Sequence, residues 1–199
     1  MPRRRPPTPT FIASSDESLV DLARNGQAAG LGGLYDRYAE RMLRTAWRLT
    51  GSTADAEDVV HDVFVALTTS LHQYEHRGAL QAWLAQVTAR AALMRIRKAR
   101  SRHEADLSEA IATLKHTGTD SAAQYYDLER QIAALPEALR SVFVLREIEG
   151  FSHDEIAGLL EISPGASRVR LSRALVSLRA MLRPLTPLAV PDATVATRR

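Results

Sequence analysis

The chain has 199 residues, 45% of them hydrophobic and 25% charged, a composition that excludes an intrinsically disordered protein and allows one or two folded domains. Its net charge is only +3, and it contains no cysteine, which excludes disulfide bonds, thiolate metal sites and a cysteine nucleophile. The longest stretches without Asp, Glu, Lys or Arg, 63–74 and 78–89, are too short to span a bilayer.

The N-terminal residues predict an arm followed by a short helix. Residues 1–13 are rich in proline and arginine and lack the apolar segment of a signal peptide, so we expect a flexible arm on a cytoplasmic protein without membrane insertion. Ser14 and Glu17 have the spacing of a capping box, which predicts a helix that ends at Arg24.

Three further helices are predicted before residue 103. The glycines of 26–33 indicate a loose segment, and the apolar spacing of 34–50 then predicts a helix ended by Gly51. Ser52 or Thr53 is placed to cap the next helix. The apolar stripe expected on that helix is Val60, Val63, Phe64, Leu67 and Leu71. A fourth helix is expected over 78–102, with Leu80, Trp83, Leu84, Val87 and Ala91 facing inward.

The second half of the chain predicts another helical unit. Leu128, Ile132 and Leu135 are expected to line its first helix. Ser152 and Glu155 form a second capping-box pattern, and Ser163 and Pro164 are typical of the cap and first residue of the last helix. The buried stripe expected on that last helix is Leu171, Leu175, Leu178 and Leu182.

These elements predict an all-α protein of two small helical domains joined by a flexible acidic linker. The expected parts are the arm 1–13, a domain over 14–102, the linker 103–124 with a possible short helix at 107–114, a domain over 125–184, and a disordered tail 185–199.

The charges of the chain are strongly segregated. Residues 76–103 hold six Arg and one Lys without an acid, and residues 165–183 hold five Arg without an acid. Acidic residues dominate 16–62 and 104–129 instead. Two basic helices separated by an acidic spacer favour a protein that contacts a polyanion at two places.

The last two helices predict a helix-turn-helix. With the leucine stripe buried, about 100° per residue puts Ala166, Val169, Arg170 and Arg173 on the outward face. Small residues let such a helix enter the major groove of DNA, and arginine reaches guanine edges or phosphates.

Several segments are similar to the extracytoplasmic-function (ECF) group of bacterial sigma-70 factors. In the N-terminal half they are Leu34-Tyr35-Asp36-Arg37-Tyr38, Asp55-Ala56-Glu57-Asp58-Val59-Val60, Val63-Phe64 and Trp83-Leu84. In the C-terminal half they are Leu135-Pro136-Glu137, Arg146-Glu147-Ile148-Glu149-Gly150-Phe151-Ser152, Glu155-Ile156-Ala157 and Arg170-Leu171-Ser172-Arg173-Ala174. The resemblance covers about 17–183, with both halves in the order of the family.

The resemblance implies a subunit that binds core RNA polymerase and promoter DNA, and that an anti-sigma factor restrains. Contacts with core polymerase are implied for Asp55, Glu57, Asp58, Val59, Asp62, Val63 and Phe64. Contacts with the −10 element are implied for Arg90, Arg95, Arg97, Lys98 and Arg100. Contacts with the −35 element are implied for Ala166, Arg168, Val169, Arg170 and Arg173. No catalytic residue, metal ligand or cofactor is implied.

Two other functions would each explain part of the sequence. An autonomous helix-turn-helix regulator would explain 125–183 but would leave the acidic 55–62 helix and the basic 76–103 helix without a role. A nucleic-acid enzyme would need a site that the sequence lacks. His72 and His76 have i, i+4 spacing, but they stand outside any HExxH pattern, and the glycines form no phosphate-binding loop.

Overall fold

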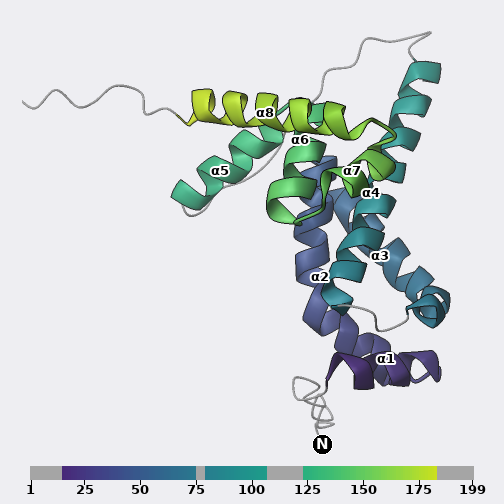
Figure 1. Ribbon diagram of the computed structural model, residues 1–199. Helices are drawn as coiled ribbons and strands as arrows, with labels where there is room; N and C mark the ends of the chain where they lie inside the picture. Colours follow the sequence, from purple (N-terminus) through teal and green to yellow (C-terminus); the bar gives the residue numbers. More distant parts are fainter. Residues whose placement is uncertain (1–14, 75–78, 107–122, 183–199) are drawn as a thin grey trace, which may run out of the picture.

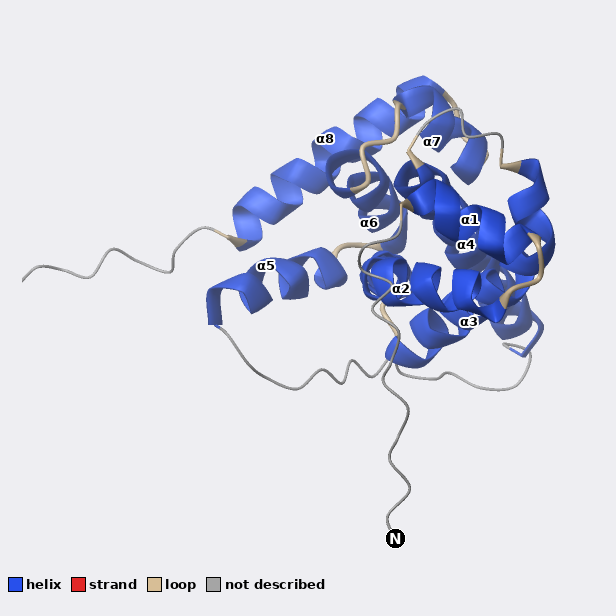
Figure 2. Ribbon diagram, turned by 90° about the horizontal axis from the view of Figure 1, so that it is seen from below, coloured by secondary structure: helices blue, strands red, loops and turns tan. Residues whose placement is uncertain are grey.

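The computed structural model describes residues 15–74, 79–106 and 123–182 (Figure 1). These residues form eight α-helices and contain no strand (Figure 2), which confirms the all-α class. None of the helices within this described part is both long and apolar enough to cross a membrane. The possible short helix at 107–114 lies outside the described residues.

The first four helices form an N-terminal bundle. They are α1 (Asp16–Arg24), α2 (Ala28–Thr50), α3 (Thr53–Ser70) and α4 (Leu80–Asp106), with a short 3-10 turn at Leu71–Gln73. The long helix α2 packs against α1, α3 and α4, and its Leu34 and Leu49 are fully buried with Leu67 of α3. Of the two candidate caps of α3, Ser52 is the one observed, since its hydroxyl accepts from the Asp55 N–H at 3.2 Å, and Thr53 is the first residue of the helix.

Two expectations about the start of this bundle were wrong. The N-cap of α1 is Ser15, whose hydroxyl accepts from the Ser18 N–H, and not Ser14. The segment 26–33 is helical from Ala28 onward instead of loose. The reason is close packing of α1 on α2, because a Cβ at Gly30 would lie only 2.6 Å from the carbonyl oxygen of Leu19.

The burial of α4 also departs from the expected stripe. Leu80 and Leu84 are buried as predicted, whereas Trp83, Val87 and Ala91 are only half-buried. The most enclosed side of the helix carries small residues in their place, namely Ala85, Thr88, Ala89 and Ala92. These small side chains allow α4 to lie close to α2 and α3.

The last four helices form a C-terminal bundle. They are α5 (Ala123–Ala134), α6 (Glu137–Phe143), α7 (His153–Leu160) and α8 (Pro164–Met181), and a π-helical turn at Val144–Ile148 continues α6. The capping box of Ser152 and Glu155 is confirmed, and so are Ser163 as the cap of α8 and Pro164 as its first residue. Gly150 ends the preceding helical segment with a φ of 80°.

Two predicted core positions of the C-terminal bundle are exposed. Leu128 of α5 and Leu182 at the end of α8 each expose 44% of their surface. The buried side of α8 is centred on Ser167, Ala174 and Leu178, which pack toward α6 and α7. Leu182 lies just past the last residue of α8, whereas Leu128 lies in the middle of α5 on its exposed side.

The two bundles pack against each other. α2 contacts α5, α6 and the π-helical turn, and α4 contacts α7. Figure 1 shows α6 beside the C-terminal end of α2 and α7 beside α4, with α8 lying across the top of both. The buried apolar side chains of both bundles form one continuous cluster.

Candidate functional surfaces

An acidic, solvent-facing surface lies on α3. Glu57, Asp58 and Asp62 are exposed there, and Val65 is 59% exposed beside them. Asp55, in the first turn, complements the positive end of the helix dipole. The surface therefore combines negative charge with an apolar side chain, a combination suited to a basic protein partner.

The apolar residues expected on this surface differ in burial, since two lie in the core of the bundle and one is partly exposed. Val59 and Val63 are 1% and 2% exposed and pack in the core of the bundle. Phe64 is half-buried and contacts Tyr35 of α2, with ring centroids 4.9 Å apart. Tyr35 is 53% exposed and was not singled out from the sequence, although its helical offset from the buried Leu34 and Tyr38 indicates an outward position.

Arg95 of α4 bonds to the acidic surface itself. Its Nε donates to Asp55 Oδ1 at 2.5 Å, and its Nη2 pairs with Asp58. The hydrogen bond with Asp55 is the main reason that the pKa of Arg95 is raised. The resemblance implied different partners for these residues, core polymerase for Asp55 and Asp58 and the −10 element for Arg95. The structure places them in contact with one another.

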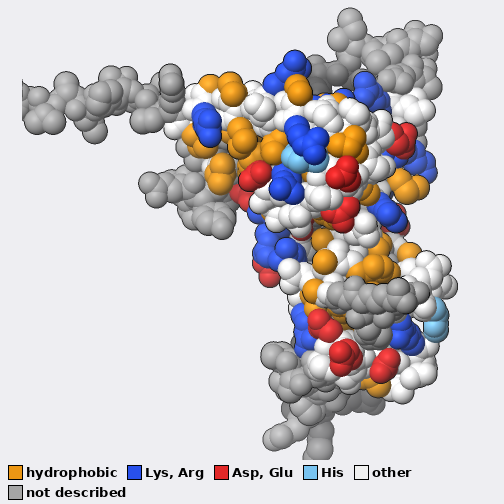
Figure 3. Space-filling view, viewed as in Figure 1, with side chains coloured by type: hydrophobic (Ala, Val, Ile, Leu, Met, Phe, Trp, Pro, Cys, Tyr) orange, Lys and Arg blue, Asp and Glu red, His pale blue; other side chains and the backbone are white. Residues whose placement is uncertain are grey.

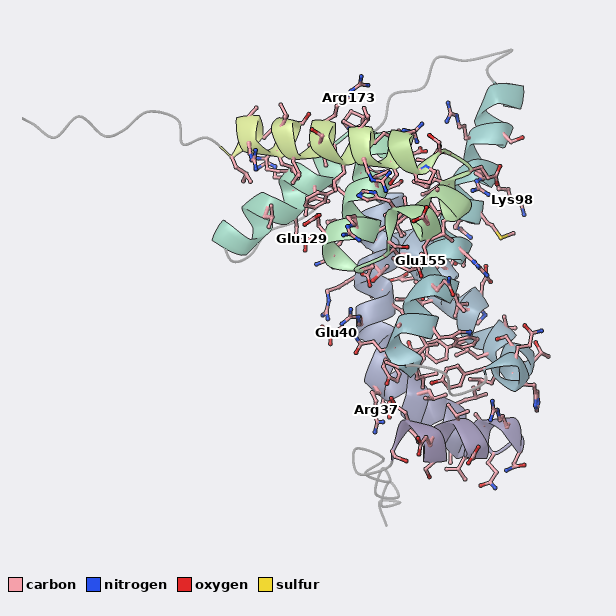
Figure 4. The ribbon with its side chains drawn as sticks, viewed as in Figure 1. Arg37, Glu40, Lys98, Glu129, Glu155 and Arg173 are labelled. Carbon is pink, nitrogen blue, oxygen red and sulfur yellow. The ribbon has the colours of Figure 1, made fainter. Side chains whose placement is uncertain are left out.

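The remaining basic residues of α4 differ in their contacts. Arg97 donates to the carbonyl oxygen of Leu159 at 2.6 Å and pairs with Glu161 at 3.0 Å, so it binds the C-terminal end of α7. Arg90, Lys98 and Arg100 are exposed. Lys98 projects from the side of α4 (Figure 4), and within the described ranges neither it nor Arg90 has an acidic partner.

The helix-turn-helix exposes a basic face on α8. The Ser163 hydroxyl accepts from the Ala166 N–H at 3.1 Å, which fixes the first turn. Arg168, Val169 and Arg173 are exposed there, and Ala166 and Arg170 are half-buried. Arg173 points away from the rest of the chain (Figure 4). None of these three arginines has an acidic partner in the part of the chain that the structure describes, so each is able to contact a phosphate or a base edge.

Charges of both signs are visible on the face drawn in Figure 3. Lys and Arg side chains lie over α8, with Asp and Glu side chains among them toward α7, and several Asp and Glu side chains lie over α1 at the opposite end. Among the residues described, no three side chains of His, Cys, Asp or Glu come together as a metal site.

Comparison with known families matches both halves of the chain. The family model "Sigma-70 region 2" matches residues 34–102, and "Sigma-70, region 4" matches residues 125–178.

Two relatives are 31% identical to the chain. The RNA polymerase sigma factor CarQ of Myxococcus xanthus aligns over 171 residues, which are 82% of this chain and 95% of CarQ. The ECF RNA polymerase sigma factor SigE of Mycolicibacterium smegmatis aligns over 153 residues, or 73% of this chain, and the chain spans 59% of its length.

Solved structures share the fold. CnrH in complex with the cytosolic domain of CnrY has a TM-score of 0.52 at 25% identity, covering 84% of this chain and 96% of that one. The sigma factor RpoE in complex with the anti-sigma factor NepR, from Bartonella quintana, has a TM-score of 0.54 at 22% identity, covering 72% and 90%. The two-bundle arrangement is therefore one that known proteins adopt.

Proposed function

The chain belongs to the sigma-70 family, in its ECF group, and from this membership we propose which of its surfaces meets which partner. As a sigma factor it binds core RNA polymerase and directs it to promoters. The match over 34–102 disfavours the autonomous helix-turn-helix regulator, because such a regulator would need only the C-terminal bundle. The family is not known for enzymatic activity, and we propose that the polymerase carries all of the catalysis.

We assign the core-polymerase contact to the acidic surface of α3. Glu57, Asp58 and Asp62 would pair with basic residues of the polymerase, and Phe64 would supply apolar contact. Asp55 would act through Arg95, to which it is bonded. Val59 and Val63 would support this surface indirectly, by packing α3 onto the core of the bundle, since their side chains are buried.

We assign the −10 contact to α4 and the −35 contact to α8. Arg90, Lys98 and Arg100 are placed to meet phosphates, and Arg95 and Arg97 would join them after leaving their present partners. On α8, Arg170 and Arg173 would reach base edges, Arg168 a phosphate, and Val169 a thymine methyl group. Ala166 would keep the start of the helix narrow enough for the groove.

The proposal includes domains, partners and location. The domain over 14–102 would carry the polymerase and −10 contacts, and the domain over 125–184 the −35 contact. An anti-sigma factor would restrain the chain; the sigma factor RpoE, whose fold the chain shares, is bound to the anti-sigma factor NepR in its solved structure. Transcription takes place in the bacterial cytoplasm, which would be the location of the chain, and no cofactor is needed.

The observation that carries this proposal is the basic face of α8, whose arginines have no acidic partner among the described residues, in a chain that also matches region 2. The test is run-off transcription with purified core polymerase on genomic fragments, with the start sites mapped. We expect starts to share two elements at a fixed spacing. Starts unchanged from those of core alone would contradict the function, and tight sequence-specific binding by the isolated chain would favour the autonomous regulator.

A further inference from the structure

The outward side of α4 carries a methionine among cations. Met94 is 66% exposed, the largest exposed fraction of any large hydrophobic residue in the described part of the chain. Single exposed apolar residues are common on protein surfaces, so exposure alone assigns no role. Met94 differs because Arg90 and Lys98, four residues before and after it, are exposed as well. Four residues turn a helix by about 400°, so the three side chains form one row along α4.

The cations of this row are available to a polyanion. Neither Arg90 nor Lys98 has an acidic partner within the described ranges, and Lys98 projects from the side of the helix (Figure 4). Along the helix axis the two residues are about 12 Å apart, which exceeds the rise of about 3.4 Å per nucleotide in a stacked strand. The two cations can therefore bind phosphates on both sides of a nucleotide whose base faces Met94.

Apolar residues extend this row toward the start of α4. Val87 and Trp83 precede Met94 by seven and eleven residues, which places each of them within about 20° of it around the helix. Both are half-buried. The ring of Trp83 packs on that of Tyr74, with centroids 5.4 Å apart, so Trp83 is already engaged within the bundle. Met94 is thus the protruding end of an apolar strip whose other members are partly packed.

An apolar side chain in a basic row suits an unstacked base better than a duplex. In a duplex the faces of the bases are covered by their neighbours, and the major groove offers an apolar group only at the methyl of thymine. A base that has left its stack exposes an apolar face, and proteins that bind single strands combine contacts to such faces with cations along the backbone. Copying a DNA strand requires unpaired bases, so a −10 element bound by α4 would present them.

We propose that Met94 packs against an unstacked base of the −10 element, between two phosphates bound by Arg90 and Lys98. This inference rests on the proposed function, which assigns the −10 contact to α4. The thioether side chain is unbranched and polarisable, so it adapts to the face of any of the four bases. Met94 therefore holds one position of the opened strand through its base, whatever the sequence there.

The test measures how tightly short single strands bind to core polymerase that carries the full-length chain. Glutamine has nearly the length and helix propensity of methionine, so Met94→Gln changes polarity alone. We expect it to weaken binding by about four- to fifteenfold, as for one or two methylene groups withdrawn from an apolar contact. Met94→Leu, which stays apolar, binds like the wild type. Thermal melts of the free variants check that each is folded.

Abasic probes locate the base that Met94 contacts. The probes are −10 strands of the mapped promoters, in which each base in turn is replaced by an abasic site that keeps its phosphate. At one position we expect the abasic site to weaken binding of the wild type by the same factor as Met94→Gln does. Met94→Gln should lose nothing further at that position, because the base and the side chain are two halves of one contact.

Ala99→Gln is the matched control, because Ala99 is exposed on the same helix but lies about 140° from Met94 around it. It leaves binding unchanged. Lys98→Ala separates the base contact from the phosphate contacts. Loss of a phosphate contact weakens binding to all probes alike and lowers the slope of log affinity against log salt by about 0.7 on a single strand. Met94→Gln leaves this slope unchanged.

Three results would overturn the inference. They are equal binding by Met94→Gln and the wild type, a loss for Met94→Gln that persists at every abasic position, and weaker binding of Met94→Gln to core polymerase without DNA. The last result would place Met94 in a protein interface instead. Failure of the proposed function looks different, because it appears in the wild type, which then adds no transcription starts to those of core alone. Both conclusions fall in that case, before any variant is compared.

Discussion

His153 Nδ1 lies 2.9 Å from the hydroxyl of Ser167, so the first residue of α7 is hydrogen-bonded to the buried side of α8. Ser167 is fully buried, and among the described residues this is the side-chain hydrogen bond that joins the two helices, beside their apolar packing. It therefore helps to set the angle at which α8 leaves the turn.

Replacing Ser167 by alanine removes this bond. We expect the free energy of unfolding to fall by about 1 kcal/mol, because the imidazole loses a buried partner. Discrimination between −35 sequences should weaken as well, because α8 is less firmly oriented. Thermal denaturation and transcription from a library randomised at −35 measure the two effects. Ser172→Ala, on the exposed side of α8, is the control and should change neither.

Arg173→Ala should relax sequence preference at one position of the −35 element. A side chain that reads a base edge contributes about 1–3 kcal/mol of discrimination, whereas a phosphate contact weakens all sequences alike. The measurement is transcription from a library randomised at both elements. Arg179→Ala, near the end of the same helix, should leave the preference intact. A shift at −10 instead of −35 would show that the recognition face is wrongly assigned.

Asp62→Lys and Asp58→Lys should behave differently although both residues lie on the acidic surface. Asp62 has no basic partner in the described part of the chain, so its reversal should slow association with core polymerase without lowering the melting temperature. Asp58 pairs with Arg95, so its reversal should lower both the association rate with core polymerase and the melting temperature. Stopped-flow association at two salt concentrations and thermal melts separate the cases. Unchanged association for both variants would remove α3 from the polymerase contact.

Gly30→Ala should destabilise the packing of α1 on α2. The new methyl group would lie 2.3 Å from the backbone nitrogen of Ala23, and such overpacking costs about 1–3 kcal/mol. Gly32→Ala is the matched control in the same helix, since nothing lies within 4 Å of its Cβ, and it should stabilise by about 0.5–1 kcal/mol. Urea unfolding measures both. Equal effects of the two substitutions would contradict the close approach.

The capping box of α7 should make stability depend on pH. Hydrogen bonds from the side chain and backbone of Ser152 lower the pKa of Glu155. A lowered carboxyl pKa in the folded state stabilises above the unfolded value, about 4.3, and this contribution is lost as the pH falls through the folded value. The urea midpoints of the wild type and of Glu155→Gln should therefore differ at pH 7. They should converge as the pH falls to the pKa that Glu155 has in the folded state. A constant difference across this range would exclude the linkage.

Local features of the fold were predictable from the sequence, and features that depend on distant residues were not. The caps at Ser52, Ser152 and Ser163 need only a hydroxyl and a free N–H three residues later, so their spacing reveals them. The helical start of α2 needs Gly30 to meet α1, which no local pattern encodes. The exposure of Leu128 likewise depends on how α5 packs on other helices, which its own sequence pattern does not encode.

The candidate surfaces follow the same rule. The outward face of α8 follows from helical periodicity, and Val169 and Arg173 are exposed as expected. The partners of Arg95 and Arg97 lie 40 and 62 residues away in the chain, so composition indicated two basic residues but not what they contact. Charge segregation predicts a surface, whereas only the tertiary structure decides which of its charges are already neutralised.

Glu161 ends α7 in a left-handed conformation, with a φ of 55° that costs a residue bearing a Cβ about 1–2 kcal/mol. Glycine would adopt this conformation without strain, but it would lack the carboxylate that pairs with Arg97. Glu161→Gly should therefore relieve the backbone strain at the end of α7 and at the same time remove the ion pair that joins this end to α4. A single position in this protein thus carries both a local cost in the backbone and a tertiary contact that offsets it.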